Sequence, residues 1–372
     1  MSAARGAGLR ERLWWSPRPS PGDRLLGAPL LLAEGLFRAG AAARGALHDA
    51  GVLSSKQATV PVISVGNLAV GGAGKTPVAL AIAGRLLGAG RRPAVLSRGY
   101  GATRGDDRVV SDGERLLLDA AAGGDEPVLL ARRLPGLRVL CGPDRARLAP
   151  VAVAAGADVL LLDDGFQHRR LRRDLDVVVL DASNPWGNGH CLPFGPNREP
   201  RSALSRAGLV WLTHADRAGA GELDALRALA RDFTGNDPID SRHAARDLTN
   251  GRLEGSIPLS ELAGRRVGLL TGVARPENVR RTVEGLGAKV VGEYPFPDHH
   301  RFSEREVVAA MEAVRREGGE WMVTTEKDAV RLPEAVAGDP RIFAVRIDAE
   351  VLRGEEVLGA ALCAALLGGS TE

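Results

Sequence analysis

Residues 69–77 read Ala-Val-Gly-Gly-Ala-Gly-Lys-Thr-Pro and match the phosphate-loop pattern, in which a small residue and four variable ones precede Gly-Lys-Thr. Glycines let the backbone curl so that N–H groups point at phosphate oxygens, the lysine adds positive charge, and the threonine hydroxyl can bind Mg²⁺. A strand expected at 62–65 precedes the loop and a helix at 78–87 follows it, so the loop opens a helix N-terminus that favours an anion. The predicted nucleotide-binding residues are Ala69, Val70, Gly71, Gly72, Ala73, Gly74, Lys75 and Thr76.

Lysine is rare in this chain, which strengthens the prediction. Only Lys56, Lys75, Lys289 and Lys327 are lysines among 49 basic residues, and the other 45 are arginines. A chain that uses arginine for nearly every positive charge places a lysine inside the glycine loop. The alternative, a glycine-rich turn before an ordinary helix, leaves that choice unexplained.

Length and composition set further bounds. A chain of 372 residues predicts two or three domains, and 44% hydrophobic residues allow sizeable cores. Cys141, Cys191 and Cys363 show neither paired nor metal-ligand spacing, which indicates a reducing compartment. A net charge of +3 is too small to indicate nucleic-acid binding, and no obligate protein partner is evident.

Residues 1–50 differ from the rest of the chain. They contain seven arginines against four acidic residues, a surplus equal to the net charge of the whole chain, together with Trp14-Trp15 and clustered leucines. The longest uncharged apolar run, residues 25–33, includes Pro29 and is far shorter than the roughly 20 residues of a spanning helix. The run lies too late, and lacks a cleavage site, for a signal peptide. The pattern predicts short helices lying in a membrane interface; the alternative is a helical hairpin packed on its own domain.

From residue 60 onward, expected strands and helices alternate, and continuous apolar runs predict a parallel sheet covered on both faces. The expected fold is α/β, with two Rossmann-like α/β/α domains, the first a phosphate-loop NTPase-type parallel sheet, and ligands at the C-terminal ends of the strands. The first strands are expected at 60–65, 93–97, 138–141, 158–162, 176–180 and 207–212, followed by a polar connection at 214–256 that contains a helix. Later strands are expected at 266–271, 289–294, 321–324 and 342–347, and helices at 276–286, 303–317 and 355–367. The expected parts are an amphipathic helical membrane-associated segment (1–53), a phosphate-loop domain (54–215), a connecting segment (216–255) and a smaller C-terminal α/β domain (256–372).

A second motif follows the strand expected at 158–162. Residues 159–170 read Val-Leu-Leu-Leu-Asp-Asp-Gly-Phe-Gln-His-Arg-Arg. Carboxylates at a strand tip are typical of the acidic partner of a phosphate loop, which holds the Mg²⁺ shell. The alternative is a polar turn before a basic helix.

Other polar clusters stand at probable ends of elements. Asp125-Glu126-Pro127 begins a predicted helix, where helix capping is the alternative explanation. The adjacent histidines of Pro297-Asp298-His299-His300 are weak evidence for a metal. The remaining clusters are 97–101, 141–145, the Gly/Pro-rich stretch 184–200 and Thr-Thr-Glu-Lys-Asp at 324–328.

Taken in order, these motifs resemble the tetraacyldisaccharide 4'-kinases of lipid A biosynthesis over roughly residues 10–335. The phosphate loop alone is unspecific, but its combination with Asp-Asp-Gly-Phe-Gln-His and Asp-His-His is specific. The basic, Trp- and Leu-containing N-terminus is also similar to that family. Cys191, Phe194 and Asn197 depart from its usual small or aliphatic residues and affect only local loop contacts.

The resemblance implies transfer of the ATP γ-phosphate to the 4'-hydroxyl of a tetraacyldisaccharide 1-phosphate, which gives lipid IVA, at the cytoplasmic face of a bacterial inner membrane. Asp125, paired with His299, would accept the hydroxyl proton; the two fall in different predicted domains, so the pair is expected to form across a cleft. Lys75 would neutralise developing charge. The implied Mg²⁺ ligands are Thr76, Glu126, Asp163 and Asp164, and the implied substrate contacts are Arg98, Tyr100, Arg145, Gln167, His168 and Glu199.

Two other classes of protein remain open at this point. A nucleotide-driven switch or positioning ATPase that cycles on membranes also has a phosphate loop, but such ATPases often carry a second lysine where this chain has Val70. The other class is a soluble kinase for a small metabolite, against which the arginine-rich, Trp-bearing N-terminus argues more weakly.

Overall fold

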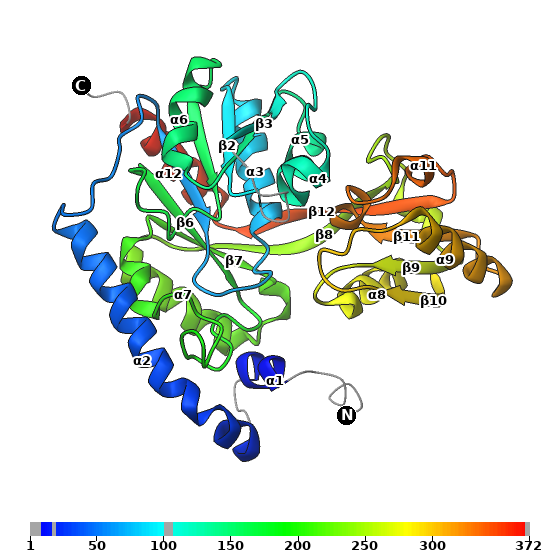
Figure 1. Cartoon of the computed structure of the whole chain (residues 1–372), viewed down its shortest axis with the longest axis horizontal. Helices are drawn as coiled ribbons and strands as arrows, with labels where there is room; N and C mark the ends of the chain where they lie inside the picture. The colour runs from blue at the N-terminus through cyan, green and yellow to red at the C-terminus, as the bar shows by residue number, and fades with distance from the viewer. Residues whose placement is uncertain (1–8, 17–19, 100–106, 369–372) are drawn as a thin grey trace. The chain divides into compact units, whose positions relative to one another are not determined.

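The computed structural model describes residues 9–16, 20–99 and 107–368. The chain divides into two compact units, each assembled from separate stretches of sequence. The first draws on Val159–Arg242 and on the described parts of Met1–Val78 and Glu350–Glu372; the second draws on Ala79–Asp158 and His243–Ala349. The predicted α/β class is confirmed by strands and helices that alternate along the chain (Figure 1). The finer domain boundaries remain a prediction.

A parallel sheet forms the centre of the first unit. β1 (Val62–Gly66) lies between β5 (Val159–Asp163) and β6 (Leu175–Asp181). β7 (Leu209–Thr213) pairs with β6, and the first residues of β8 (Ile239–Asn250) pair with β7. All residues of β1, β5, β6 and β7 are buried, which explains their continuous apolar sequences. Because the strands are parallel, their carboxyl ends share one edge of the sheet.

The helices of the first unit cover this sheet and build its core. Leu68 and Phe166 pack with the buried side of α7 (Ala220–Thr234) and with Leu204. α3 (Lys75–Gly88) begins in this unit and continues into the second. The remaining elements are the short 3₁₀ helices η2 (Arg201–Arg206) and η3 (Ala215–Arg217), the end of β12 (Ile342–Arg353) and α12 (Glu355–Gly368).

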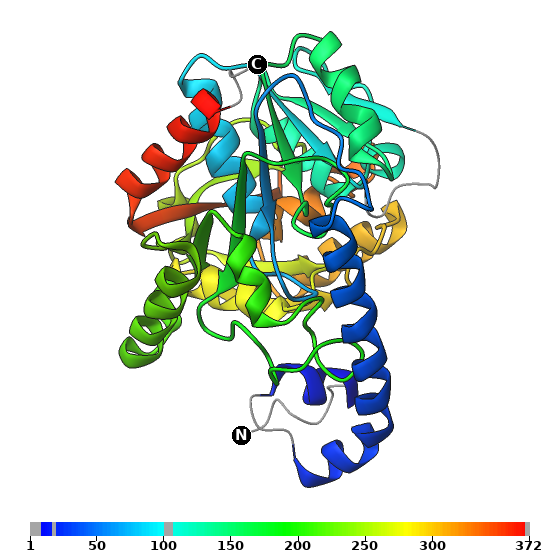
Figure 2. The same cartoon turned by 90° about the vertical axis from the view of Figure 1, so that its left-hand side faces the viewer.

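The N-terminal segment contains α1 (Leu9–Trp15) and one long helix, α2 (Pro21–Asp49), beside each other in Figure 2. Ser20 caps α2 by accepting a hydrogen bond from the Asp23 N–H at 3.1 Å. The prediction of short helices is correct for α1 and wrong for α2, because α2 continues through Pro29. As a result, Leu25–Asp49 is long and apolar enough, by length and composition, to cross a membrane.

The second unit contains two groups of strands. β2 (Pro93–Ser97) pairs in parallel with β4 (Arg138–Cys141), and β3 (Arg108–Asp112) joins β4 in the antiparallel direction. In the other group the parallel order is β10 (Lys289–Pro295), β9 (Arg266–Thr271), β11 (Trp321–Thr325) and β12. The helices and turns between these strands are α4 (Ala120–Gly123), α5 (Asp125–Arg133), α6 (Arg145–Ala154), η4 (Leu259–Leu262), α8 (Pro276–Gly285), α9 (Glu304–Arg316), α10 (Glu326–Ala329) and α11 (Glu334–Ala337).

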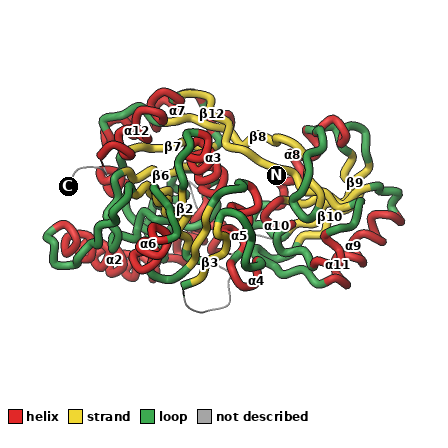
Figure 3. Tube along the Cα trace, turned by 90° about the horizontal axis from the view of Figure 1, so that it is seen from above, coloured by secondary structure: helices red, strands yellow, loops and turns green. Residues whose placement is uncertain are grey.

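The connections around β9 follow from strand order. The chain moves outward from β9 to β10 and then back past β9 to β11. Right-handed crossovers in opposite directions place their helices on opposite faces of a sheet. Figure 3 shows α8 on one side of these strands and α9 on the other, as this rule requires.

Two strands differ from the sequence prediction. The stretch 214–256 holds the expected helix, α7, but also β8, whose charged residues alternate with apolar ones only loosely. β3 was not predicted, because it is a short, partly exposed edge strand with charged ends.

Candidate active site

The phosphate loop is the turn between β1 and α3. Gly71 and Gly74 adopt positive φ values of 105° and 81°, which glycine accepts without strain. The loop is held on both sides: the Val70 N–H donates to the Pro196 carbonyl and the Thr213 hydroxyl donates to the Ala73 carbonyl, each at 2.8 Å. Lys75 and Thr76 open the 14-residue helix α3, so the positive end of its dipole faces the loop. This arrangement can cradle a phosphate.

Asp164 lies beside the loop lysine. Asp163 ends β5 and is buried, and Asp164 follows it with a left-handed φ of 49°. The Lys75 Nζ atom is 3.6 Å from Asp164 Oδ1, and Arg198 Nη1 donates to Asp164 Oδ2 at 2.8 Å. The aspartate therefore lies between two cations at the carboxyl edge of the sheet.

Gln167 and Glu199, two predicted substrate contacts, are brought together in the same unit. Gln167 Nε2 donates to the Asn67 carbonyl at 2.9 Å and to Glu199 Oε1 at 3.0 Å. Glu199 also pairs with Arg206 at 2.8 Å. His168 is half-buried one residue further along the turn.

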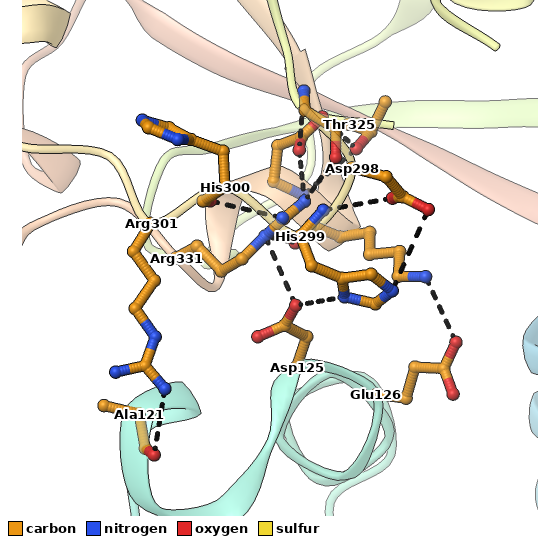
Figure 4. A network of polar contacts seen from close by, with 12 residues as sticks. Ala121, Asp125, Glu126, Asp298, His299, His300, Arg301, Thr325 and Arg331 are labelled. Atoms are coloured by element: carbon orange, nitrogen blue, oxygen red, sulfur yellow. Dashed lines mark hydrogen bonds and ion pairs between the residues drawn. The ribbon is translucent and has the colours of Figure 1, made fainter. Parts of the chain in front are cut away.

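The second unit holds the predicted Asp125–His299 pair. Asp125 is buried at the first residue of α5, where the helix N-terminus favours its negative charge. His299 Nδ1 lies 2.9 Å from Asp125 Oδ2, although 174 residues separate the two (Figure 4). His299 has a left-handed φ of 61°. A carboxylate that accepts a hydrogen bond from Nδ1 leaves Nε2 as the basic nitrogen of the ring.

The predicted metal ligands are divided between the units. Thr76, Asp163 and Asp164 belong to the first unit and Glu126 to the second. Glu126 Oε1 lies 3.2 Å from Lys327 Nζ, and both side chains are half-buried. No group of three or more His, Cys, Asp or Glu side chains suited to a metal occurs among the described residues.

The other predicted contacts lie at the ends of elements. Arg98 is exposed directly after β2, and Arg145 is buried at the first residue of α6, which Asp144 caps. Tyr100 lies outside the described residues.

Sequence reasoning missed a second His–Asp pair. Asp181 ends β6 and His214 directly follows β7, at the carboxyl edge of the first unit's sheet, with His214 Nδ1 3.3 Å from Asp181 Oδ1. Burial alone would raise the pKa of Asp181, but hydrogen bonds from His214 and Ser183 outweigh it and lower this pKa to about 2. The rule that ligands gather at strand ends could have identified both residues.

The low pKa of Asp181 predicts a pH dependence of stability. The folded pKa lies below the unfolded value, so the ionised carboxylate stabilises the fold above pH 4, and this contribution is lost as the pH falls toward 2. Asp181→Asn should therefore lower the free energy of unfolding by about 2 kcal/mol at pH 7. We expect the difference from wild type to shrink between pH 5 and pH 3 in urea unfolding. Asp232→Asn, at an exposed carboxylate on α7, is the control; a pH-independent difference for Asp181→Asn would contradict the assignment.

Nearly the whole chain is similar to proteins of one family. A family model described as tetraacyldisaccharide-1-P 4'-kinase matches residues 26–367. A tetraacyldisaccharide 4'-kinase from Anaeromyxobacter sp. (strain Fw109-5) is 63% identical over 360 residues, which cover 96% of this chain and 97% of that protein. One from Geobacter sulfurreducens is 40% identical over 319 residues, covering 84% and 86%. The crystal structure of LpxK from Aquifex aeolicus in complex with ATP superposes with a TM-score of 0.77 at 31% identity, covering 92% of this chain and 99% of that one.

Proposed function

The chain belongs to the tetraacyldisaccharide-1-phosphate 4'-kinase family, and on that premise we propose how its residues transfer the γ-phosphate of ATP to the 4'-hydroxyl of a tetraacyldisaccharide 1-phosphate. The observation that carries the proposal is that each unit, taken by itself, organises residues that phosphoryl transfer needs. The first unit has a phosphate loop with Lys75 at its helix N-terminus, and the second has an oriented Asp–His pair. Their product would be lipid IVA.

The phosphate loop would bind the nucleotide. The backbone N–H groups of residues 71–76 would contact the β- and γ-phosphates, and the Lys75 ammonium would neutralise the charge that develops during transfer. Arg198 donates to Asp164, the ion-pair partner of Lys75, and this contact would help to keep Lys75 beside the loop.

The Asp125–His299 pair would prepare the acceptor. A sugar hydroxyl is a weak nucleophile until a base removes its proton, and a positioned base contributes about 10²–10⁴ in rate. His299 is held by Asp125 through Nδ1, so Nε2 would take the proton while the buried carboxylate stabilises the resulting imidazolium. The two residues would act as one unit.

Mg²⁺ fits the residues beside the loop. With a nucleotide the ion keeps several waters and needs only one or two protein ligands, so a preformed cage is not required. The Thr76 hydroxyl and the carboxylates of Asp163 and Asp164 have the oxygen chemistry that it prefers, and family resemblance implies Glu126 as a further ligand. The bound ion would neutralise phosphate charge. The remaining proposed substrate contacts are Arg98, Tyr100, Arg145, Gln167, His168 and Glu199.

We further propose that α2 docks the enzyme on the cytoplasmic face of the inner membrane, where a lipid substrate lies. One face of α2 is tied to its own unit: Glu34 is buried and accepts hydrogen bonds from Cys191 N at 2.8 Å and from His190 Nδ1 at 2.9 Å, and Asp49 pairs with Arg169. On the other face leucines are open, with Leu25 76% and Leu32 81% exposed. Because α2 is held to the protein near its middle and at its end, we infer that it lies in the membrane interface and does not cross the bilayer.

This docking predicts a loss of membrane binding without loss of fold. Replacing the four most exposed leucines of α2 by serine should move the protein from liposomes to the soluble fraction, because each leucine loses about 1.5–3 kcal/mol of burial in lipid. The positions are Leu25, Leu26, Leu32 and Leu36. Flotation with anionic liposomes measures the membrane-bound fraction, and thermal unfolding checks that the variant is folded.

The control variant changes four exposed leucines elsewhere, Leu116, Leu117, Leu352 and Leu367, to serine. It should float like the wild type. A folded α2 variant that still floats, or a wild type that does not, would show that α2 does not dock the enzyme.

The function itself is tested by ATP consumption with and without a detergent-dispersed tetraacyldisaccharide 1-phosphate. A lipid kinase consumes ATP in proportion to the acceptor, and the acceptor gains one phosphate. Consumption that depends on membranes but leaves the acceptor unchanged would favour a switch ATPase. Phosphorylation of small metabolites alone would favour a soluble kinase.

A further inference from the structure

We propose that Arg331 is a positioning residue that holds both members of the Asp125–His299 pair in their reactive arrangement. The inference rests on the proposed function of that pair. Arg331 lies three residues after the polar cluster at 324–328, which ends at Asp328. The proposed phosphoryl transfer does not involve Arg331 directly.

Arg331 is the most buried cation near the pair, with its side chain 1% exposed. Its Nε atom lies 3.5 Å from Asp125 Oδ2, the same oxygen that His299 Nδ1 contacts. Its other nitrogens contact two backbone carbonyls: Nη1 donates to that of His300 at 3.2 Å, and Nη2 to that of Gly272, after β9, at 3.0 Å. One guanidinium thus contacts the carboxylate and the backbone on both sides of the site (Figure 4).

Gly272 connects Arg331 to the backbone of His299. The His299 N–H donates to the Gly272 carbonyl at 3.2 Å, the same carbonyl that Arg331 Nη2 contacts. The Gly272 N–H donates to Asp328 Oδ1 at 3.0 Å. A Cβ atom at Gly272 would lie 3.1 Å from Asp328 Oδ1, so this close approach favours glycine. His299 can keep its left-handed backbone because these contacts determine it from several directions.

Asp328 fixes the orientation of Arg331. It is completely buried, pairs with Arg331 Nη2, and accepts a hydrogen bond from the Thr325 hydroxyl at 2.8 Å. Burial raises the pKa of Asp328, and the Arg331 charge opposes that effect. A buried ion pair contributes little net stability compared with apolar residues of the same size. Arg331 also contacts Asp125, His300 and Gly272. The Asp328–Arg331 ion pair therefore has a second role, which is to set the geometry of His299.

The test compares Arg331→Lys with the matched variant Arg346→Lys. Lysine keeps the charge opposite Asp328 but is a single point donor and cannot contact Asp125, His300 and Gly272 together. Arg346 forms a similar forked contact with Asp247 and the Gly255 carbonyl in the same unit, and neither of these partners belongs to the Asp125–His299 pair. We expect kcat to fall about 10–100-fold in Arg331→Lys, since a displacement near 1 Å costs that much, with KM for ATP unchanged. Arg346→Lys should keep the wild-type kcat.

A second measurement separates positioning from general damage to the fold. Guanidinium at non-denaturing concentration should partly restore the kcat of Arg331→Ala, because it can refill the cavity with the missing fork, and should not act on Asp125→Ala. If Arg331→Ala does not fold, Arg331→Lys carries the test alone. A wild-type kcat in folded Arg331→Lys would overturn the inference, as would an equal kcat loss in Arg346→Lys at equal thermal stability. Failure of the wild type to phosphorylate the lipid would instead overturn the proposed function.

Discussion

Lys75→Ala is expected to abolish phosphoryl transfer while the protein remains folded. The lysine lies at the N-terminus of α3 beside the glycine loop, and it is the only cation of that loop. Removing one preorganised donor of a transferring group costs about 10²–10³ in kcat, and a full positive charge should cost at least that. The fold should tolerate the change because Asp164 keeps its ion pair with Arg198. Turnover and thermal unfolding measure the two effects.

Lys289→Ala is the matched control for this variant. Lys289 is exposed at the first residue of β10 and is one of the three other lysines. We expect it to behave like the wild type. Near wild-type turnover in folded Lys75→Ala would contradict the assignment of residues 69–76 as the nucleotide site.

The second large effect concerns the Asp125–His299 pair. Asp125→Ala and His299→Ala should each lower kcat by about 10²–10⁴, the usual contribution of a positioned base. The double variant should be little worse than the more damaging single one, because groups that act as a unit are not additive. The measurement is kcat for the two single variants and the double variant under saturating ATP and lipid.

His300→Ala is the control for the histidine. Its ring is turned away from Asp125 in Figure 4 and contacts Glu306 at 3.2 Å, so its loss should leave kcat close to that of the wild type. Effects of Asp125→Ala and His299→Ala that multiply in the double variant would show that the two residues act separately.

The features that were predictable from the sequence are those fixed by short stretches of chain. The phosphate loop and its flanking strand and helix were predictable because glycine, lysine and a buried apolar strand each have a local physical reason. Buried parallel strands such as β5 and β6 were predictable because both faces are covered and the sequence is apolar throughout.

Features that depend on distant contacts were not predictable from residues alone. β8 has exposed charged positions in its middle, so its sequence resembles a polar connection until its neighbours are known. α2 continues through Pro29, although proline disfavours a helix interior. The pairing of Asp125 with His299 came only from family resemblance, since 174 residues separate them.

Arg331 shows the limit most clearly. One arginine among 45 carries no signal in the sequence. Its position is defined by Gly272, His300 and Asp125, which come from three different parts of the chain. These three residues lie beside the Arg331 guanidinium only when the second unit is folded.

The most direct test of the central claim is the position of the phosphate on the product. Purified enzyme, MgATP and a tetraacyldisaccharide 1-phosphate are incubated, and the product is fragmented in a mass spectrometer or examined by NMR. The proposed reaction predicts one new phosphate on the 4'-hydroxyl of the distal sugar, formed by the wild type and not by Lys75→Ala or Asp125→Ala. A product phosphorylated elsewhere, or an acceptor left unchanged while ATP is consumed, would contradict it.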